Sequence, residues 1–202
     1  MRTFTINFPK PDASLVEDVL SLIENTNMKD AENIAGKWNI AQPLLKPNLN
    51  SAFVYAVFNQ EIHEKFMEQY RDIFNGYDVK LYLAVFKNIN PENGLAFFQA
   101  HTDTKRDIGL NFVIDAGGSN VLTNFYNSTK PIVERGLLGL DSDLVLEKTV
   151  KFNQDTWVVM DTSIFHSVDN IEGTRLVLSV QINDLDYASF IQQNESILTE
   201  LQ

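Results

Sequence analysis

Apolar and polar residues alternate in short runs through the part of the chain that follows residue 78. A period of two is typical of strands that bury one face, and many of these runs are rich in β-branched and aromatic residues. Turn-forming segments such as NINPENG, DAGGS and DNIEG separate the runs. The pattern predicts eight short strands, at residues 79–86, 94–101, 107–114, 120–126, 144–152, 156–160, 163–168 and 175–182.

A period of three to four residues replaces this alternation near both ends of the chain. It predicts a helix over residues 11–26, where Ser14 and Glu17 match a capping box, and a second helix over residues 59–74 that stops before Gly76. The remaining short elements are a helix that starts after Asp30, a strand at residues 51–58 and a closing helix at residues 187–201.

This order of elements predicts a mainly β protein with packing helices, in the α+β class. Strands in this number favour a β-sandwich or jelly roll with helices on one outer face. We expect a single domain over residues 1–202, because 44% of the residues are hydrophobic and no linker is visible. Within it, residues 1–77 form a support region of helices and a strand, and residues 78–183 form the β core.

The composition restricts the classes of partner. The formal net charge is -11 and no basic cluster stands out, so a nucleic-acid partner is not expected. The chain has no cysteine, which excludes disulfides and thiolate metal sites. It shows no apolar run long enough to span a membrane and no signal-peptide pattern at its start, so we expect a soluble cytoplasmic protein.

Three residues form a candidate metal site. His101 and Asp103 lie two positions apart at the end of a predicted strand, so their side chains project to one face, whereas Thr102 faces the other way. His166 lies in a later strand. Two histidines and one carboxylate form the facial triad of non-haem Fe(II) oxygenases, and zinc hydrolases use the same donors. The alternative is that these are ordinary polar residues at strand rims.

Arg175 is a candidate anion-binding residue. It opens the run RLVLSVQI, whose alternation places it on the same face as Ser179 and opposite an entirely apolar face. A buried cation needs a partner, and a small dicarboxylate would fit the guanidinium fork, with Ser179 adding a hydrogen bond. The alternative is a structural ion pair with Asp161, Asp169 or Glu172.

The pattern His101-x-Asp103, then His166, then Arg175 nine residues later resembles the Fe(II)/2-oxoglutarate-dependent dioxygenases, particularly the prolyl and aspartyl hydroxylases. The resemblance covers residues 79–182 and implies a double-stranded β-helix, a cupin-like jelly roll. It also implies Fe(II) on the triad, 2-oxoglutarate on Arg175, dioxygen as oxidant and ascorbate as an auxiliary reductant. The reaction implied is hydroxylation of an amino-acid side chain, in a small molecule or in a peptide or protein.

The second contact to the cosubstrate is less well defined by the resemblance. Prolyl-hydroxylase-type members often carry a tyrosine before the histidine–aspartate motif, but here Phe86 and Phe98 lie near that place. Tyr82 is the nearest upstream tyrosine, and the candidates for this contact are Tyr82, Asn111, Asn124 and Ser179. Of these we predict that Tyr82 and Ser179 complete the cosubstrate site.

Other readings remain open. A cupin-like metalloenzyme could use the same triad without 2-oxoglutarate, and a β-sandwich binding module would need no triad at all. His63 matches a surface helix position. Lys105 and Arg106 match solvated charges, and the alternative is that they contact an anionic group on the substrate. Residues 127–143 could form a lid, and the sequence names neither the substrate nor the oligomeric state. The aromatic residues expected to line or support the site are Phe97, Phe112, Phe125 and Trp157.

Overall fold

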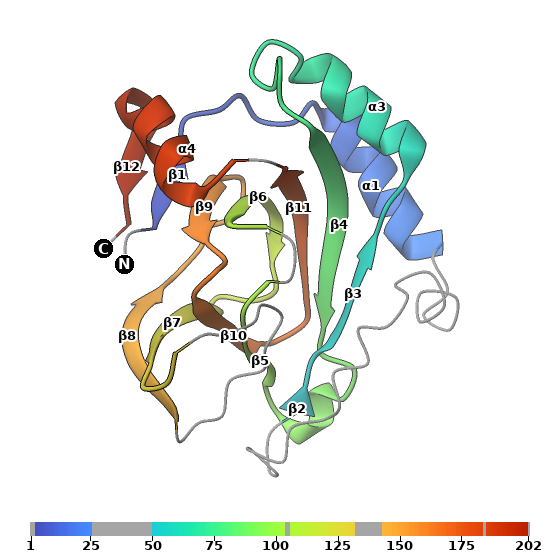
Figure 1. Ribbon diagram of the computed structural model, residues 1–202. Helices are drawn as coiled ribbons and strands as arrows, with labels where there is room; N and C mark the ends of the chain where they lie inside the picture. The colour runs from blue at the N-terminus through green and yellow to red at the C-terminus, as the bar shows by residue number, and fades with distance from the viewer. Residues whose placement is uncertain (1–2, 26–49, 104–105, 132–142, 184, 202) are drawn as a thin grey trace.

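Two β-sheets form the body of the protein (Figure 1). The computed structural model describes residues 3–25, 50–103, 106–131, 143–183 and 185–201. All strand pairs in the larger sheet are antiparallel, and in the smaller sheet only the pair β2–β5 is parallel. The larger sheet has the order β12-β1-β9-β6-β11-β4-β3, with strands β1 (Phe4–Ile6), β3 (Phe53–Val57), β4 (Val79–Lys87), β6 (Ile108–Ala116), β9 (Trp157–Asp161), β11 (Thr174–Ile182) and β12 (Leu198–Glu200). The smaller sheet has the order β2-β5-β10-β7-β8, with strands β2 (Asn50–Ser51), β5 (Ala96–His101), β7 (Leu122–Ser128), β8 (Leu144–Val150) and β10 (Phe165–Ile171).

The eight strands predicted after residue 78 are all present. They divide evenly, with β4, β6, β9 and β11 in the larger sheet and β5, β7, β8 and β10 in the smaller one. Consecutive strands therefore mostly alternate between the sheets, as in a jelly roll. The predicted fold class, a mainly β jelly roll with packing helices, is confirmed.

The support region contributes a strand near each end of the larger sheet. Strand β1 pairs with β9, and the predicted strand at residues 51–58 is confirmed as β2 and β3, of which β3 pairs with β4. Helices α1 (Ala13–Asn25) and α3 (Gln60–Gln69) lie beside each other on the outer side of this sheet (Figure 1). Their apolar faces pack with the outward side chains of the sheet in one buried cluster, which includes Val19, Phe66, Leu81 and Leu178.

The predicted helix ends need correction. Helix α1 begins at Ala13, so Ser14 lies inside the helix and the predicted capping box is wrong. Helix α3 begins as predicted, after Asn59, whose side chain accepts a hydrogen bond from the Ile62 N–H, but it ends at Gln69 rather than residue 74. The helix predicted after Asp30 lies outside the described residues. Within the described chain, no helix is long and apolar enough to cross a membrane.

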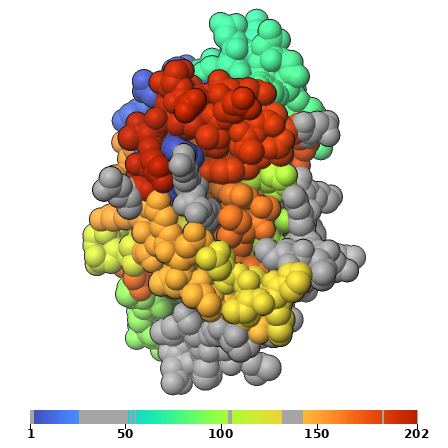
Figure 2. Space-filling model, turned by 60° about the vertical axis from the view of Figure 1, so that its left-hand side comes forward, coloured from blue at the N-terminus to red at the C-terminus, as the bar shows by residue number. Residues whose placement is uncertain are grey.

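The closing helix is shorter than predicted. Helix α4 (Tyr187–Asn194) gives way to a 3-10 turn (Glu195–Ile197) and then to strand β12, so the helix predicted over residues 187–201 is wrong beyond Asn194. Strand β12 pairs with β1. The last described residue also packs on the β-core, since the Lys148 ammonium donates to the Leu201 carbonyl. In Figure 2 the C-terminal residues lie together above the strands β7 and β8.

Candidate metal and cosubstrate site

A cavity of about 320 Å³ lies between the two sheets. Strand β11 forms part of its wall, with Arg175, Val177, Ser179 and Gln181 turned toward it. The intervening residues, such as Leu178, belong to the outer core cluster instead. The two faces predicted for this strand from its alternation are confirmed, and they give the cavity both charged and polar groups.

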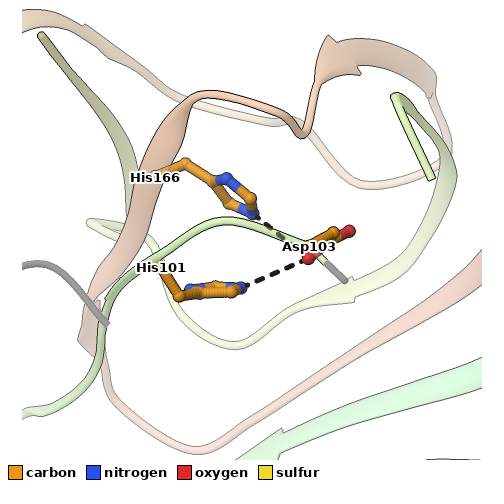
Figure 3. Close-up of side chains that lie close together, drawn as sticks. All are labelled: His101, Asp103 and His166. Atoms are coloured by element: carbon orange, nitrogen blue, oxygen red, sulfur yellow. Dashed lines mark ion pairs between the residues drawn. The ribbon is translucent and has the colours of Figure 1, made fainter. Parts of the chain in front are cut away.

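The three candidate ligands meet in this cavity (Figure 3). His101 on β5 lies directly opposite His166 on β10 in the antiparallel pairing, with ring centroids 4.3 Å apart. The chain then leaves β5, and the Asp103 N–H donates to the Thr162 carbonyl over 2.9 Å, which fixes the backbone beside the histidines. One oxygen of Asp103, Oδ1, lies 3.5 Å from Nε2 of His101 and 3.9 Å from Nε2 of His166. Sequence spacing and strand pairing thus bring the three together.

Backbone carbonyls orient both imidazoles. Nδ1 of His101 lies 2.9 Å from the Gln99 carbonyl, and Nδ1 of His166 lies 2.9 Å from the Ile164 carbonyl. Because a carbonyl oxygen only accepts hydrogen bonds, each Nδ1 carries the proton in the neutral ring. The lone pair of each neutral ring is therefore on Nε2, the nitrogen that faces Asp103. A histidine binds a metal ion through such a lone pair while its other nitrogen donates a hydrogen bond.

The donor set fits a divalent metal ion. Nitrogen and oxygen ligands bind such ions at about 2.0–2.2 Å, so one ion can bridge atoms up to about 4.4 Å apart. The two distances from Asp103 to the histidines fall within this range, and all three ligand atoms lie within 4.8 Å of one another. Three protein ligands on one side leave further coordination positions for other molecules.

The protonation states also suit metal binding. Burial, with a smaller contribution from neighbouring His101, lowers the pKa of His166 to about 4, so this imidazole is neutral near pH 7. Burial raises the pKa of Asp103, but the nearby Arg106 and the two histidines outweigh it and hold that pKa well below its ordinary value. The site therefore presents a carboxylate and a neutral imidazole before any metal arrives.

Arg175 lies in the same cavity and is almost fully buried, with 4% of its surface exposed. Its Nε and Nη1 groups have no hydrogen-bond partner among the described residues. The guanidinium lies over the Phe152 ring, 5.5 Å from the centroid, and burial lowers its pKa to about 10, so it stays charged at neutral pH. A buried, charged guanidinium with unpaired donors is costly unless an anionic partner binds it.

The alternative partners of Arg175 are engaged elsewhere. Asp169 accepts from Asn124 Nδ2 over 2.8 Å, and Asp161 accepts from both the N–H and the hydroxyl of Ser163. Glu172 accepts a longer bond from Ser119. Within the described residues Arg175 forms none of the structural ion pairs considered from the sequence.

Ser179 and Tyr82 both line the cavity, as the sequence predicts, and they are partners across β11 and β4. The Ser179 hydroxyl donates to Asn111 Oδ1 over 2.7 Å and accepts from Arg106 Nη1 over 2.7 Å. The one hydrogen of the Ser179 hydroxyl is therefore already donated to Asn111. The roles of Ser179 and Tyr82 as cosubstrate contacts stay predictions.

Arg106 is a site residue that sequence reasoning missed. It was interpreted as a solvated charge, but its Nε donates to Asp103 Oδ2 over 2.6 Å and it lines the cavity. A charge three residues after an aspartate is too common in sequences to carry a signal, so only the folded geometry identifies it.

The remaining sequence predictions have mixed outcomes. His63 is partly buried, and its Nδ1 accepts a hydrogen bond of 3.4 Å from the Leu81 N–H, so it is not a plain surface residue.

Phe112 and Trp157 belong to the outer core cluster, so their predicted place beside the cavity is wrong. Lys105 and most of the 127–143 segment lie outside the described residues. The aromatic side chains that do line the cavity are Tyr82, Phe86, Phe98 and Phe152.

Known structures share this architecture. A prolyl hydroxylase from Trichoplax adhaerens, solved with a peptide fragment of the hypoxia inducible factor, gives a TM-score of 0.51 at 11% identity, over 90% of this chain and 83% of that one. A prolyl-4-hydroxylase from Pseudomonas putida gives a TM-score of 0.47 at 14% identity, over 91% of this chain and 93% of that one. No protein-family model and no curated protein matches the sequence. The likeness to the Trichoplax protein shows a shared fold.

Proposed function

We propose that the protein is an Fe(II)- and 2-oxoglutarate-dependent oxygenase that hydroxylates a C–H bond of an amino-acid side chain, free or within a peptide. The observation that carries this proposal is the buried Arg175 guanidinium, whose Nε and Nη1 have no hydrogen-bond partner among the described residues, in the same cavity as His101, Asp103 and His166. A metal hydrolase with the same triad would have no need for this cation. A binding module would need neither the triad nor the arginine.

The residues have separate tasks in this proposal. His101, Asp103 and His166 would hold Fe(II), which together with dioxygen and 2-oxoglutarate supplies the oxidising chemistry and yields succinate and CO2. Arg175 would bind the far carboxylate of 2-oxoglutarate through its unpaired donors. Apolar side chains of the wall, such as Val177 and Phe98, would exclude water from the reacting atoms.

The substrate class rests on the fold comparison. The Trichoplax structure contains a peptide, which supports a peptide or protein substrate for this chain. The cavity, at about 320 Å³, has room for the cosubstrate and one side chain rather than for a large ligand.

Succinate formation tests the proposal. Purified protein receives Fe(II), 2-oxoglutarate, ascorbate and oxygen, and succinate is followed alone and with a library of proline- and asparagine-containing peptides. We expect slow formation alone, faster formation with a substrate, and loss in His166→Ala and Arg175→Gln. The matched control is Arg71→Gln, an exposed arginine outside the cavity. Turnover that survives in Arg175→Gln would contradict the assignment of this residue.

A further inference from the structure

Asp103 presents its two oxygens to different partners. Oδ1 faces the two histidines, at 3.5 and 3.9 Å, whereas Oδ2 receives the Arg106 Nε–H over 2.6 Å. Both side chains are largely shielded from solvent, with 9% of the Asp103 side chain and 18% of the Arg106 side chain exposed. Because solvent screens such a pair only weakly, the contact restricts rotation of the carboxylate.

Arg106 is itself fixed at two further points. Its Nη1 donates to the Ser179 hydroxyl over 2.7 Å, and that hydroxyl donates onward to Asn111 Oδ1. Its backbone carbonyl accepts from the Thr162 hydroxyl over 2.9 Å. The guanidinium thus ties the loop that carries Asp103 to strands β11 and β6 of the larger sheet.

We infer that Arg106 is a positioning residue for the metal site, holding Asp103 so that Oδ1 alone is presented to the ion. This inference rests on the proposed metal site. A carboxylate otherwise binds through one or both oxygens. With Oδ2 held by Arg106, Asp103 occupies one coordination position, which leaves more of the metal open to cosubstrate and oxygen.

Two effects of Arg106 on metal affinity have opposite signs, which makes the inference testable. A positive charge close to a cation opposes its binding, so simple electrostatics predicts that removing Arg106 tightens metal binding. Orientation of a ligand by a hydrogen-bonded neighbour favours binding, and loss of such a neighbour weakens metal affinity by about 10- to 100-fold. A positioning role requires the second effect to dominate.

The test is a calorimetric titration of Mn(II) into metal-free protein without 2-oxoglutarate. Arg106→Met keeps most of the packing of the side chain and removes the donors. We expect its Mn(II) affinity to fall by about 10- to 100-fold, with recovery to within about five-fold in Arg106→Lys, which restores one donor to Oδ2. Arg71→Met is the matched control and should bind as wild type.

A second readout addresses the coordination directly. The visible spectrum of the Co(II)-loaded protein reports coordination number, and release of Oδ2 in Arg106→Met should change its intensity. If Arg106→Met does not fold, Ser179→Ala removes only the far anchor and should weaken Mn(II) binding in the same direction, by a smaller factor.

The outcomes separate the inference from the proposed function. Unchanged or tighter Mn(II) binding in Arg106→Met, with an unchanged Co(II) spectrum, would overturn the positioning role while leaving the metal site intact. Failure of the wild-type protein to bind Mn(II) or Co(II) at all would overturn the metal site itself.

Discussion

The buried guanidinium of Arg175 opposes the stability of the ligand-free protein. Within the described part of the chain its Nε and Nη1 have no hydrogen-bond partner, and burial lowers its pKa to about 10. Because burial holds that pKa below its ordinary value, the folded state carries the charge at a cost at every pH below about 10. The cost is offset only when an anion occupies the cavity.

We therefore predict that Arg175→Met stabilises the ligand-free protein while removing 2-oxoglutarate binding. An apolar side chain of similar length should raise the free energy of unfolding by about 1–4 kcal/mol. Urea unfolding of both proteins measures this, with Arg71→Met as the exposed control, expected within about 0.5 kcal/mol of wild type. A destabilised Arg175→Met would mean that the guanidinium has a partner in solution.

The buried His166 makes the metal-free protein sensitive to acid. Its pKa is about 4 in the folded protein against an ordinary 6.5, so between these values the unfolded chain binds a proton that the folded chain does not. Stability therefore falls as the pH is lowered from 6.5 to 4, by on the order of 3 kcal/mol from this residue.

Urea unfolding at pH 7, 5.5 and 4.5 checks this prediction. His166→Gln should lose most of the decrease, whereas His63→Gln, in helix α3 outside the cavity, should keep it. An equal pH dependence in wild type and His166→Gln would contradict the assignment.

The turn between β6 and β7 sets the position of Arg175. Gly117 has φ +83°, and a Cβ placed on it would lie 2.8 Å from Cβ of Arg175. Its carbonyl also accepts the N–H groups of Glu172 and Gly173, which joins this turn to the one before β11. The glycine-rich DAGGS segment, predicted as a turn, thus contacts the turn before β11.

We predict that Gly117→Ala displaces Arg175. The positive φ costs about 1–2 kcal/mol for alanine, and the clash adds to it. Gly94→Ala is the matched control, because Gly94 has φ +99° with no atom within 4 Å of its added Cβ. Both variants should lose stability, but only Gly117→Ala should lose 2-oxoglutarate affinity, by about ten-fold. Equal 2-oxoglutarate affinities of the two variants would show that the close approach of Gly117 to Arg175 is not needed for binding.

Strand positions were predictable wherever alternation extended over five or more residues. Strands such as β4 and β11 fulfil this condition, and β5 and β9 were identified as short apolar runs between turn segments. In contrast, β1 and β12 have three residues each and pair with one another and, for β1, with β9. Three residues are too few to show a hydrophobic period, so whether such a segment forms a strand depends on the sheet edge that it meets. The helix predicted over residues 187–201 is too long for the same reason, because the segment of β12 is too short to show a period of two.

The candidate ligands could be predicted from their residue types and their order along the chain, although Asp103 lies beyond the end of β5, but their surroundings could not. On β6, Asn111 faces the cavity, so the adjacent Phe112 faces the outer core. The sequence does not show which face of β6 points toward the cavity, and the prediction for Phe112 depended on that face. Arg106 meets Ser179 across 73 positions of sequence, and no local pattern records such a contact.

Stability and function occupy different layers of the molecule. The large buried cluster lies between the larger sheet and its helices, whereas the cavity lies between the sheets. Phe66, fully buried in that outer cluster, stacks on Tyr70 with ring centroids 4.6 Å apart. Damage to the outer layer should therefore leave the site intact as long as the chain folds.

We predict that Phe66→Ala lowers the free energy of unfolding by about 3–5 kcal/mol without altering metal affinity at low temperature. Thermal unfolding and Mn(II) titration at 10 °C measure the two quantities on one preparation. A loss of metal affinity comparable to that of His166→Ala would show that the layers are coupled.

The most direct test of the proposed function is a titration of 2-oxoglutarate into the Mn(II)-loaded protein under anaerobic conditions, for wild type and Arg175→Met. The titration needs no knowledge of the substrate, because it measures 2-oxoglutarate binding alone. We predict saturable binding to wild type that depends on both Mn(II) and Arg175, and none to the variant. No binding to metal-loaded wild type, or equal binding to both proteins, would contradict the assignment as a 2-oxoglutarate oxygenase.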